Sequence, residues 1–264
     1  MSNMTESGSN AAGSAAVAVE NVSKIYPGGV EALSNMTLQF PRGELTSVLG
    51  PSGCGKTTLL KIIAGLLPAN SGTVMVNGQP VTGPGPERAF VFQDFALMPW
   101  ASVIRNVAFG LELRGVDKSE RMAIAEKHIE NVGLKGFENH YPHQLSGGMR
   151  QRVGLARALA VDAEILLMDE PFSAVDEQTR RKFQEDLLGV VQNEKKTFIF
   201  VTHSIEEAVY LSDSIALLLP RPSRVSEIIK PDIRRDIDPD AIRRDTVYLD
   251  TVERIWQGLR RYIE

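Results

Sequence analysis

The sequence predicts an α/β fold built on a mostly parallel sheet, and three observations support this prediction. Short apolar segments of strand length alternate along the chain with segments whose apolar residues recur at helical spacing. A glycine-rich loop at residues 50–57 joins one such strand to the helix that follows it. The run at residues 165–168 is apolar throughout, which is typical of a strand covered on both faces.

The predicted elements follow one another along residues 17–219. In the first half, strands are expected at 17–22, where weak alternation suggests an edge strand, and at 37–40, 45–49, 73–76 and 88–92. A helix is expected at 56–66, where apolar residues recur at helical spacing. In the second half, strands expected at 164–168, 197–201 and 214–219 alternate with helices at 178–191 and 204–211. Strands interleaved with helices are the pattern of a parallel sheet.

Composition divides the chain further. Residues 1–16, rich in Ser, Gly, Asn and Ala, are expected to form a disordered leader. Residues 17–220 form the main domain, and helical periodicity at about 100–160 predicts an inserted helical subdomain with helices at 103–113, 118–132 and 147–159. Residues 221–264 are expected to form a C-terminal arm, solvated over 221–245, and a helix.

The apolar residues of that last helix share one face: Tyr248, Val252, Ile255, Trp256, Leu259, Tyr262 and Ile263. We expect this face to pack on its own domain; the alternative is a contact with a second copy of the chain or with another partner.

Charge and cysteine content exclude several classes of protein. The 264 residues include 29 basic and 33 acidic side chains, a net charge of −4, which argues against binding nucleic acid through bulk electrostatics. A single cysteine excludes an internal disulfide and a cysteine-rich zinc site. No run of roughly 18 apolar residues occurs, so no membrane span is expected in this sequence.

The glycine-rich loop matches the phosphate-binding pattern G-x-x-x-x-G-K-[ST]. Glycines allow successive backbone N–H groups to face phosphate oxygens, and the helix that follows adds its positive N-terminal end. Lys56 is expected to reach the β- and γ-phosphates and Thr57 to ligate Mg²⁺. The expected nucleotide-binding residues here are Gly50, Pro51, Ser52, Gly53, Cys54, Gly55, Lys56, Thr57 and Thr58.

Cys54 lies inside this loop and has two interpretations. The simpler one is a small residue that fills space. The alternative is a thiol acidified by Lys56 and the helix N-terminus, which bound nucleotide would shield from alkylation.

An acidic pair, Asp169 and Glu170, directly follows the apolar run that ends at Met168. A carboxylate at such a strand end can hold Mg²⁺, and a second one beside it can orient and polarise an attacking water. On its own this pattern also fits a capped turn. Together with a phosphate loop upstream, it predicts a nucleotide-hydrolysing site in which Asp169 is a metal ligand and Glu170 the catalytic carboxylate.

Residues 145–152, Leu-Ser-Gly-Gly-Met-Arg-Gln-Arg, resemble the LSGGQ-type signature of ATP-binding cassette (ABC) ATPases, with Met149 in place of the common Gln. The resemblance extends from about Val17 to Leu219 and implies a P-loop nucleotide-binding domain with an added antiparallel β subdomain. It implies further landmarks in family order: Tyr26 as the adenine-stacking aromatic, Gln93 in the Q-loop, Asp176 in a D-loop with Val175 where Leu is frequent, and His203 as the switch histidine.

The same resemblance implies a shared site. Ser146, Gly147 and Gly148 open a helix and form a second anion-binding surface, which in this family covers the γ-phosphate held by another copy in a head-to-tail dimer. It also implies that Lys56, Glu170 and His203 are catalytic, that Thr57, Gln93 and Asp169 hold Mg²⁺, and that Asp176 contributes to the nucleotide site.

Three segments make the chain similar to the ATPases of nitrate/sulfonate/taurine-type importers: Leu97-Met98-Pro99-Trp100, residues 106–112 and residues 218–222. This similarity implies ATP and Mg²⁺ as cofactors. The implied partners are a second cassette, a separate membrane permease and a solute-binding protein, and the implied location is the cytoplasmic face of the inner membrane. Two alternatives remain: an exporter or lipid-transport ATPase, and a soluble ABC ATPase acting on nucleic acid.

The apolar stretch at residues 94–103 also has two interpretations. Leu97, Met98 and Trp100 line a groove for the permease or, alternatively, close the core of the domain.

Overall fold

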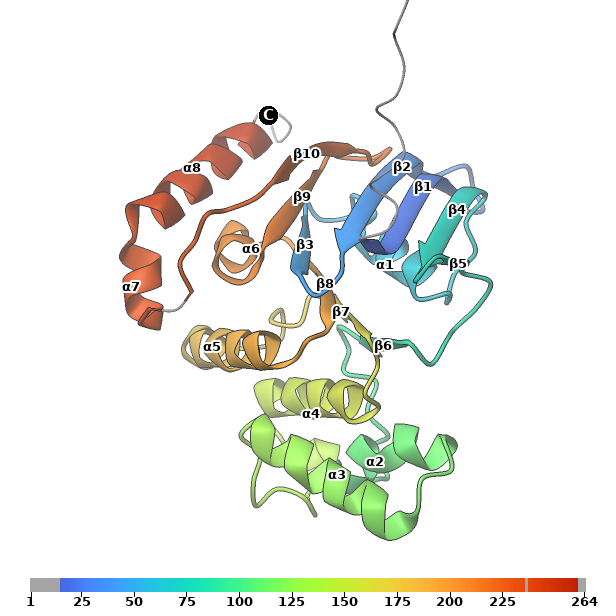
Figure 1. Ribbon diagram of the computed structural model, residues 1–264, viewed down its shortest axis with the longest axis vertical. Helices are drawn as coiled ribbons and strands as arrows, with labels where there is room; N and C mark the ends of the chain where they lie inside the picture. The colour runs from blue at the N-terminus through green and yellow to red at the C-terminus, as the bar shows by residue number, and fades with distance from the viewer. Residues whose placement is uncertain (1–14, 236, 261–264) are drawn as a thin grey trace, which may run out of the picture.

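The computed structural model describes residues 15–235 and 237–260, which form two sheets and a set of surrounding helices (Figure 1). Residues 1–14 of the predicted leader lie outside the described residues, as do Tyr262 and Ile263 of the predicted helix face. Ala15 and Ala16, also assigned to the leader, already belong to the first strand.

The central sheet has six strands in the order β10-β9-β3-β8-β7-β6. Their bounds in this order are Val225–Ile229, Ser214–Leu218, Leu45–Leu49, Thr197–Thr202, Ile165–Asp169 and Arg88–Val91. All neighbouring pairs are parallel except β10 with β9. The predicted mostly parallel core sheet is therefore confirmed. Because parallel strands share a direction, the carboxyl ends of β3, β7 and β8 meet at one edge.

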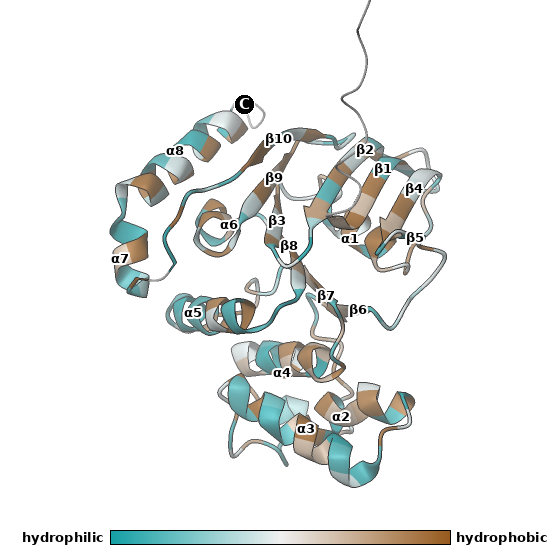
Figure 2. Ribbon diagram, in the orientation of Figure 1, coloured by the Kyte–Doolittle hydropathy of each residue, from teal (hydrophilic) through white to brown (hydrophobic). Residues whose placement is uncertain are grey.

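Alternate residues of the central strands enter different cores. On β7, Ile165 and Leu167 face the core that contains α1 (Lys56–Ile63), and Leu166 and Met168 face the core on the other side. Period-two alternation with apolar side chains on both faces explains the uninterrupted apolar run in the sequence. Figure 2 shows the corresponding hydrophobic colouring along the strands.

The second sheet is antiparallel, in the order β2-β1-β4-β5. Its strands are Glu31–Pro41, Ala15–Ile25, Ser71–Val76 and Gln79–Pro80. The prediction of an edge strand at 17–22 is wrong, because β1 pairs with both β2 and β4. Register shifts along β1, such as the one between Val19 and Val22, interrupt its alternation and gave the sequence its weak pattern.

Three helices form the subdomain at the lower end of Figure 1: α2 (Val103–Leu113), α3 (Lys118–Asn131) and α4 (Gly147–Ala160). They pack against one another, and a short 3-10 turn at Pro142–Gln144 leads into α4. Asp117 caps the start of α3 by accepting a hydrogen bond from the Ser119 amide. The helices thus match the expected positions to within one residue at each end.

The other helices are α5 (Glu177–Asn193), α6 (Ile205–Leu211), α7 (Pro239–Arg244) and α8 (Thr246–Arg260). Helix α6 contacts β3 and β8 of the central sheet, and α7 contacts α8. Helix α1 ends at Ile63, earlier than expected, because Gly65 adopts a left-handed φ of 74°. Within the described residues, no helix combines the length and apolar character that a membrane crossing requires.

Residues 221–245 were predicted to be a solvated arm, and most of the described residues of this segment are indeed exposed, but the segment is anchored to the domain, because Ser223, Ile229 and Ile242 are buried. Strand β10 extends the central sheet, and Arg235 donates hydrogen bonds of 3.1 Å to Tyr210 O and to Asp213 Oδ1. The Arg and Asp content suggested solvent, but a long arginine side chain can lie buried when its guanidinium finds acceptors.

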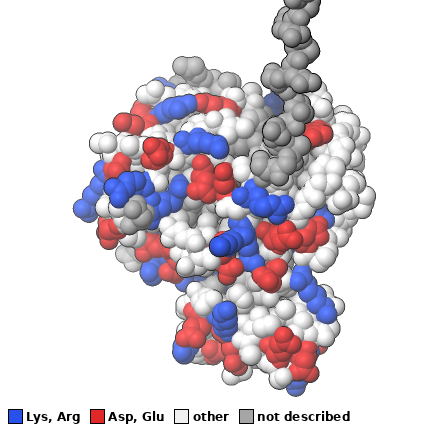
Figure 3. Space-filling model, in the orientation of Figure 1, with Lys and Arg blue, Asp and Glu red and all other residues white. Residues whose placement is uncertain are grey.

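Helix α8 packs on α6. Tyr248, Ile255 and Leu259 are buried against the domain, whereas Trp256 of the same predicted face is 50% exposed. On the face seen in Figure 3, acidic and basic side chains are intermixed.

Candidate active site

The phosphate loop joins β3 to α1 and depends on glycines for its shape. Gly53 and Gly55 have φ values of 73° and 112°, a region that strains other residues. A Cβ on Gly55 would also lie 2.8 Å from the carbonyl oxygen of Ala32. Lys56 is buried, and its Nζ donates to Gly50 O at 2.8 Å and to Pro51 O at 3.0 Å. Backbone carbonyl groups of the loop therefore hold the Lys56 ammonium group in place.

A cavity of about 170 Å³ lies beside this loop, lined by Tyr26, Ala32, Gly53, Gly55, Lys56, Thr57, Thr58, Glu170 and Arg221. The Tyr26 hydroxyl lies 3.1 Å from Thr58 Oγ1, within hydrogen-bond distance. The structure thus gathers an aromatic ring, a lysine, two threonines and a carboxylate that were each predicted for the nucleotide site. Arg221, which was not predicted for the nucleotide site, also lines the cavity; it lies two residues after the last expected strand.

Asp169 is the last residue of β7 and is buried. The Thr57 hydroxyl donates a 2.8 Å hydrogen bond to its Oδ1. Burial raises the pKa of the Asp169 carboxyl, the Thr57 hydrogen bond opposes this rise, and the nearby Glu170 adds to it. A buried carboxylate next to a hydroxyl offers the hard oxygen ligands that Mg²⁺ prefers, and a bound cation would offset the cost of ionising it. These residues fit a magnesium ion.

Glu170 follows directly and has a left-handed backbone with φ 45°, which is uncommon for a residue with a side chain. Its Oε2 lies 3.3 Å from Nδ1 of His203, which follows β8. The Glu170 side chain is 18% exposed and that of His203 is 55% exposed. The predicted catalytic carboxylate and switch histidine therefore lie in contact, at the edge of the sheet where β7 and β8 end.

The signature residues lie elsewhere and do not line the Lys56 cavity. Ser146 caps α4, and its Oγ accepts a 3.2 Å hydrogen bond from the Met149 amide. A Cβ on Gly147 would lie 2.6 Å from the carbonyl oxygen of Ala174, so the start of α4 and the D-loop approach each other at a distance that only glycine permits. A Cβ on Gly148 would lie 3.2 Å from Thr179 Cγ2 and 3.3 Å from Val175 Cγ1, so this position is tightly packed against side chains.

Asp176 ends the D-loop and caps α5, accepting a 3.0 Å hydrogen bond from the Thr179 amide. Hydrogen bonds to the Thr179 backbone and side chain lower the pKa of its carboxyl. Within one copy of the chain, Asp176 is thus a helix cap and does not line the Lys56 cavity.

Gln93 is exposed in the turn after β6, and the hydrogen bonds found among the described residues do not join it to Thr57 or Asp169.

Cys54 is buried among apolar residues, and burial raises the pKa of its thiol despite the charge of Lys56. The burial of the thiol favours the interpretation of Cys54 as a small residue that fills space beneath the loop over that of an acidified thiol.

The fold and the site together define a P-loop nucleotide-hydrolysing enzyme. The family model described as "ABC transporter" matches residues 33–173. The chain belongs to the ABC transporter family, as an ATP-binding subunit with ATPase activity.

Three similar proteins illustrate this membership. An uncharacterized ABC transporter ATP-binding protein of Methanocaldococcus jannaschii is 55% identical, over 85% of this chain and 85% of its own. The taurine import ATP-binding protein TauB of Yersinia pestis is 51% identical, over 75% of this chain and 78% of its own. The structure of a dimeric ATP-binding cassette in a post-hydrolysis state with ADP and phosphate is 33% identical, with a TM-score of 0.73, over 81% of this chain and 98% of that one.

Proposed function

We propose that the chain hydrolyses ATP at two sites shared by a pair of cassettes and thereby powers the import of a small solute through a separate membrane permease. The observation that carries this proposal is that one chain holds the predicted nucleotide-binding residues in two separate places. Lys56, Thr57 and Glu170 line one cavity, whereas Ser146, Gly147 and Gly148 open α4 outside it. A second copy would supply the missing signature surface, and the similar cassette solved as a dimer supports this arrangement.

In the proposed reaction, water attacks the γ-phosphorus of ATP and the bond to the ADP oxygen breaks. Glu170, at the cavity, orients this water and accepts its proton. Lys56 and the loop amides bind the phosphates, and His203, in contact with Glu170, holds the γ-phosphate. Thr57, Asp169 and Gln93 would hold Mg²⁺, which supplies positive charge to the phosphate oxygens. Tyr26 stacks on the adenine.

The remaining loop residues complete the phosphate cradle: Gly50, Pro51, Ser52, Gly53, Cys54, Gly55 and Thr58. Ser146, Gly147 and Gly148 of one copy close over the nucleotide of the other, and Asp176 borders the shared interface.

The proposed permease surface is the segment after the Q-loop. Trp100 is 76% exposed, while Leu97 packs partly against the core. The alternative that all these residues close the core does not hold for Trp100, and an exposed tryptophan in an apolar segment favours a partner protein. The similar protein named as a taurine import ATP-binding protein supports import of a small sulfonate-like anion. The proposal includes a solute-binding protein in the complex and a place at the cytoplasmic face of the inner membrane.

A purification experiment tests this proposal. The tagged chain is isolated from solubilised membranes of its own cells, and its partners are identified by mass spectrometry. We expect a permease and a solute-binding protein with the wild type, and loss of both with Trp100→Asp. The control is Leu249→Asp, which places a charge on an exposed position of α8. An exporter-type permease without a solute-binding protein, or co-purified nucleic acid, would contradict the import proposal.

A further inference from the structure

Glu207 is a buried carboxylate that the proposed chemistry does not use. It lies in the first turn of α6, and the residue is 7% exposed. Its Oε2 accepts a 2.6 Å hydrogen bond from the Thr202 hydroxyl, and both groups are buried. Burying a charged carboxylate without a hydrogen-bond partner would cost folding free energy, and the hydrogen bond from Thr202 reduces this cost for Glu207.

The Thr202 hydroxyl has a second role. Its oxygen accepts a 3.0 Å hydrogen bond from the Ser204 amide, across the backbone of His203. A hydroxyl has one proton, and here that proton goes to Glu207, which leaves the oxygen lone pairs directed at Ser204. The carboxylate thus fixes the orientation of the hydroxyl, and the hydroxyl fixes the turn from which the His203 side chain emerges.

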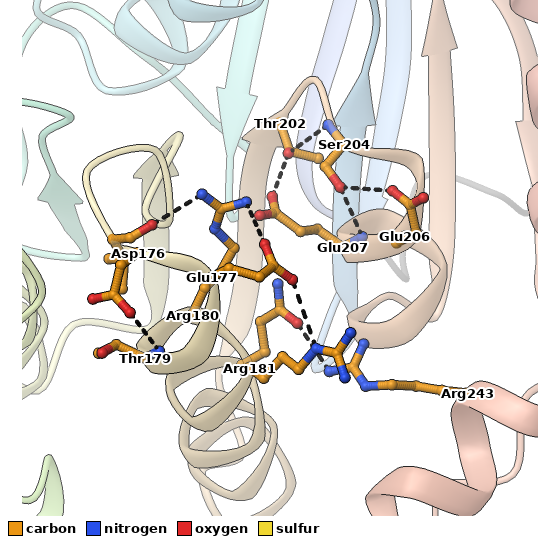
Figure 4. Close-up of polar contacts among 12 residues, drawn as sticks. Asp176, Glu177, Thr179, Arg180, Arg181, Thr202, Ser204, Glu206, Glu207 and Arg243 are labelled. Atoms are coloured by element: carbon orange, nitrogen blue, oxygen red, sulfur yellow. Dashed lines mark hydrogen bonds and ion pairs between the residues drawn. The ribbon is translucent and has the colours of Figure 1, made fainter.

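A third bond closes this turn. The Glu207 amide donates to Ser204 Oγ at 3.3 Å, which caps α6. Glu207 therefore binds both chain neighbours of His203 (Figure 4): its carboxylate binds Thr202, and its backbone amide binds Ser204. The His203 side chain itself is 55% exposed and lies 3.3 Å from Glu170 Oε2.

Arg180 of α5 lies near Glu207, and its guanidinium pairs with the carboxylate of Glu177 at 3.3 Å (Figure 4). The guanidinium donates a 2.9 Å hydrogen bond to the carbonyl oxygen of Val175, in the D-loop. Burial raises the pKa of the Glu207 carboxyl, whereas the Thr202 hydrogen bond and the charges of Arg180 and His203 oppose this rise, and Glu170 adds to it. The charge of Arg180 thus offsets part of the burial cost of the carboxylate that accepts the hydrogen bond from Thr202.

We propose that Glu207 is a positioning residue for ATP hydrolysis, which holds His203 in place through the Thr202 hydroxyl. It touches neither nucleotide nor the reacting atoms, and it acts only through its neighbours. The inference rests on the proposed role of His203.

Kinetics of three variants test the proposal. Glu207→Ala removes the acceptor, and we expect kcat to fall about 10- to 100-fold, the scale of a small misplacement, while KM for ATP changes less than about twofold. Glu207→Gln retains a carbonyl oxygen as acceptor and should recover most of the rate. The control is Glu253→Ala on α8, which removes an exposed carboxylate that accepts a 2.8 Å hydrogen bond from Gln257 Nε2 and has no bond to the residues around His203 among the described residues; its kcat should stay near the wild-type value.

Nuclear magnetic resonance separates positioning from general loss of structure. The chain has four histidines, and the His203 imidazole signals are identified by their disappearance in His203→Gln. We expect these signals to shift in Glu207→Ala and to remain in place in Glu207→Gln. If Glu207→Ala does not fold, Thr202→Val removes the hydroxyl instead and should cause the same shift and the same loss of kcat, which Thr202→Ser restores.

Several results would overturn the proposal: wild-type kcat in Glu207→Ala, a loss of kcat that Glu207→Gln does not recover, or unchanged His203 signals. Wild-type turnover by His203→Gln would refute the proposed role of His203, and the imidazole signals would then still show whether Glu207 positions the ring.

Discussion

The hydroxyl of Thr57 donates a 2.8 Å hydrogen bond to Oδ1 of Asp169, although 112 positions separate the two residues in the chain. Thr57 lies in the first turn of α1 and Asp169 at the end of β7. The bond joins the phosphate loop to the acidic strand end, and it places together the two oxygen ligands on which the proposed magnesium site depends.

Asp169→Asn tests this site. The amide oxygen can still accept the Thr57 proton, so the fold should persist. Burial raises the pKa of Asp169, so the ionised side chain costs folding free energy, and the neutral variant should have an equal or higher melting temperature without ligand. The rise in melting temperature on adding Mg²⁺ and ADP should shrink strongly. Thermal unfolding measures both effects, with Asp250→Asn on α8 as control; a full ligand-induced rise in Asp169→Asn would contradict the assignment.

Glu170→Gln should bind ATP but hydrolyse it about 10²- to 10⁴-fold more slowly, because the amide cannot accept a proton from water. ATP should then hold two copies together, so that size-exclusion chromatography with ATP shows a dimer that the wild type forms only transiently. Glu164→Gln, just before the same strand, is the control for a lost carboxylate. Rapid turnover by Glu170→Gln would rule out its role as the catalytic carboxylate.

Tyr26→Ala should weaken nucleotide binding by about 1–3 kcal/mol, the range measured for stacking of bases on aromatic side chains. Tyr26→Phe removes only the hydroxyl, which lies 3.1 Å from Thr58 Oγ1, and should bind almost as tightly as the wild type. Titration calorimetry with ADP distinguishes the two. An equal loss in both variants would assign the effect to the hydroxyl and not to the ring.

Gly147→Ala should disturb the shared site without disturbing nucleotide binding by a single copy. The new methyl group would lie 2.6 Å from the Ala174 carbonyl oxygen, so the start of α4 and the D-loop must separate. We expect ATP-dependent dimerisation and steady-state hydrolysis to fall while the Kd for ADP stays unchanged. Gly189→Ala in α5 is the matched control, because a Cβ there meets no atom within 4 Å; it should add about 0.5–1 kcal/mol of stability. Dimerisation equal to wild type in Gly147→Ala would contradict this account.

The parts predicted best from the sequence are those whose structure is decided locally. Gly53 and Gly55 allow the left-handed turns of the loop, and the apolar run before Asp169 is sufficient to indicate a strand buried on both faces. The helical subdomain was equally clear, because its caps and apolar spacing lie within each segment. Here local sequence and tertiary structure agree.

The parts that were missed depend on partners distant in the chain. Strand β10 pairs with β9, and Arg235 finds its acceptors on residues 210 and 213, so neither could be read from a segment rich in Arg and Asp. For the same reason the sequence did not indicate Arg221 at the cavity or Glu207 beneath the histidine turn. Polar composition alone does not distinguish a solvated side chain from a buried one with partners.

The left-handed backbone of Glu170 separates two selective pressures at one position. Glycine and asparagine adopt a φ near 45° more easily than glutamate does. A library of variants screened only for thermal stability should therefore accumulate glycine or asparagine at position 170. A library screened for growth that depends on transport should retain glutamate. The identity of residue 170 would then record what a population has been selected for, independently of how well its members fold.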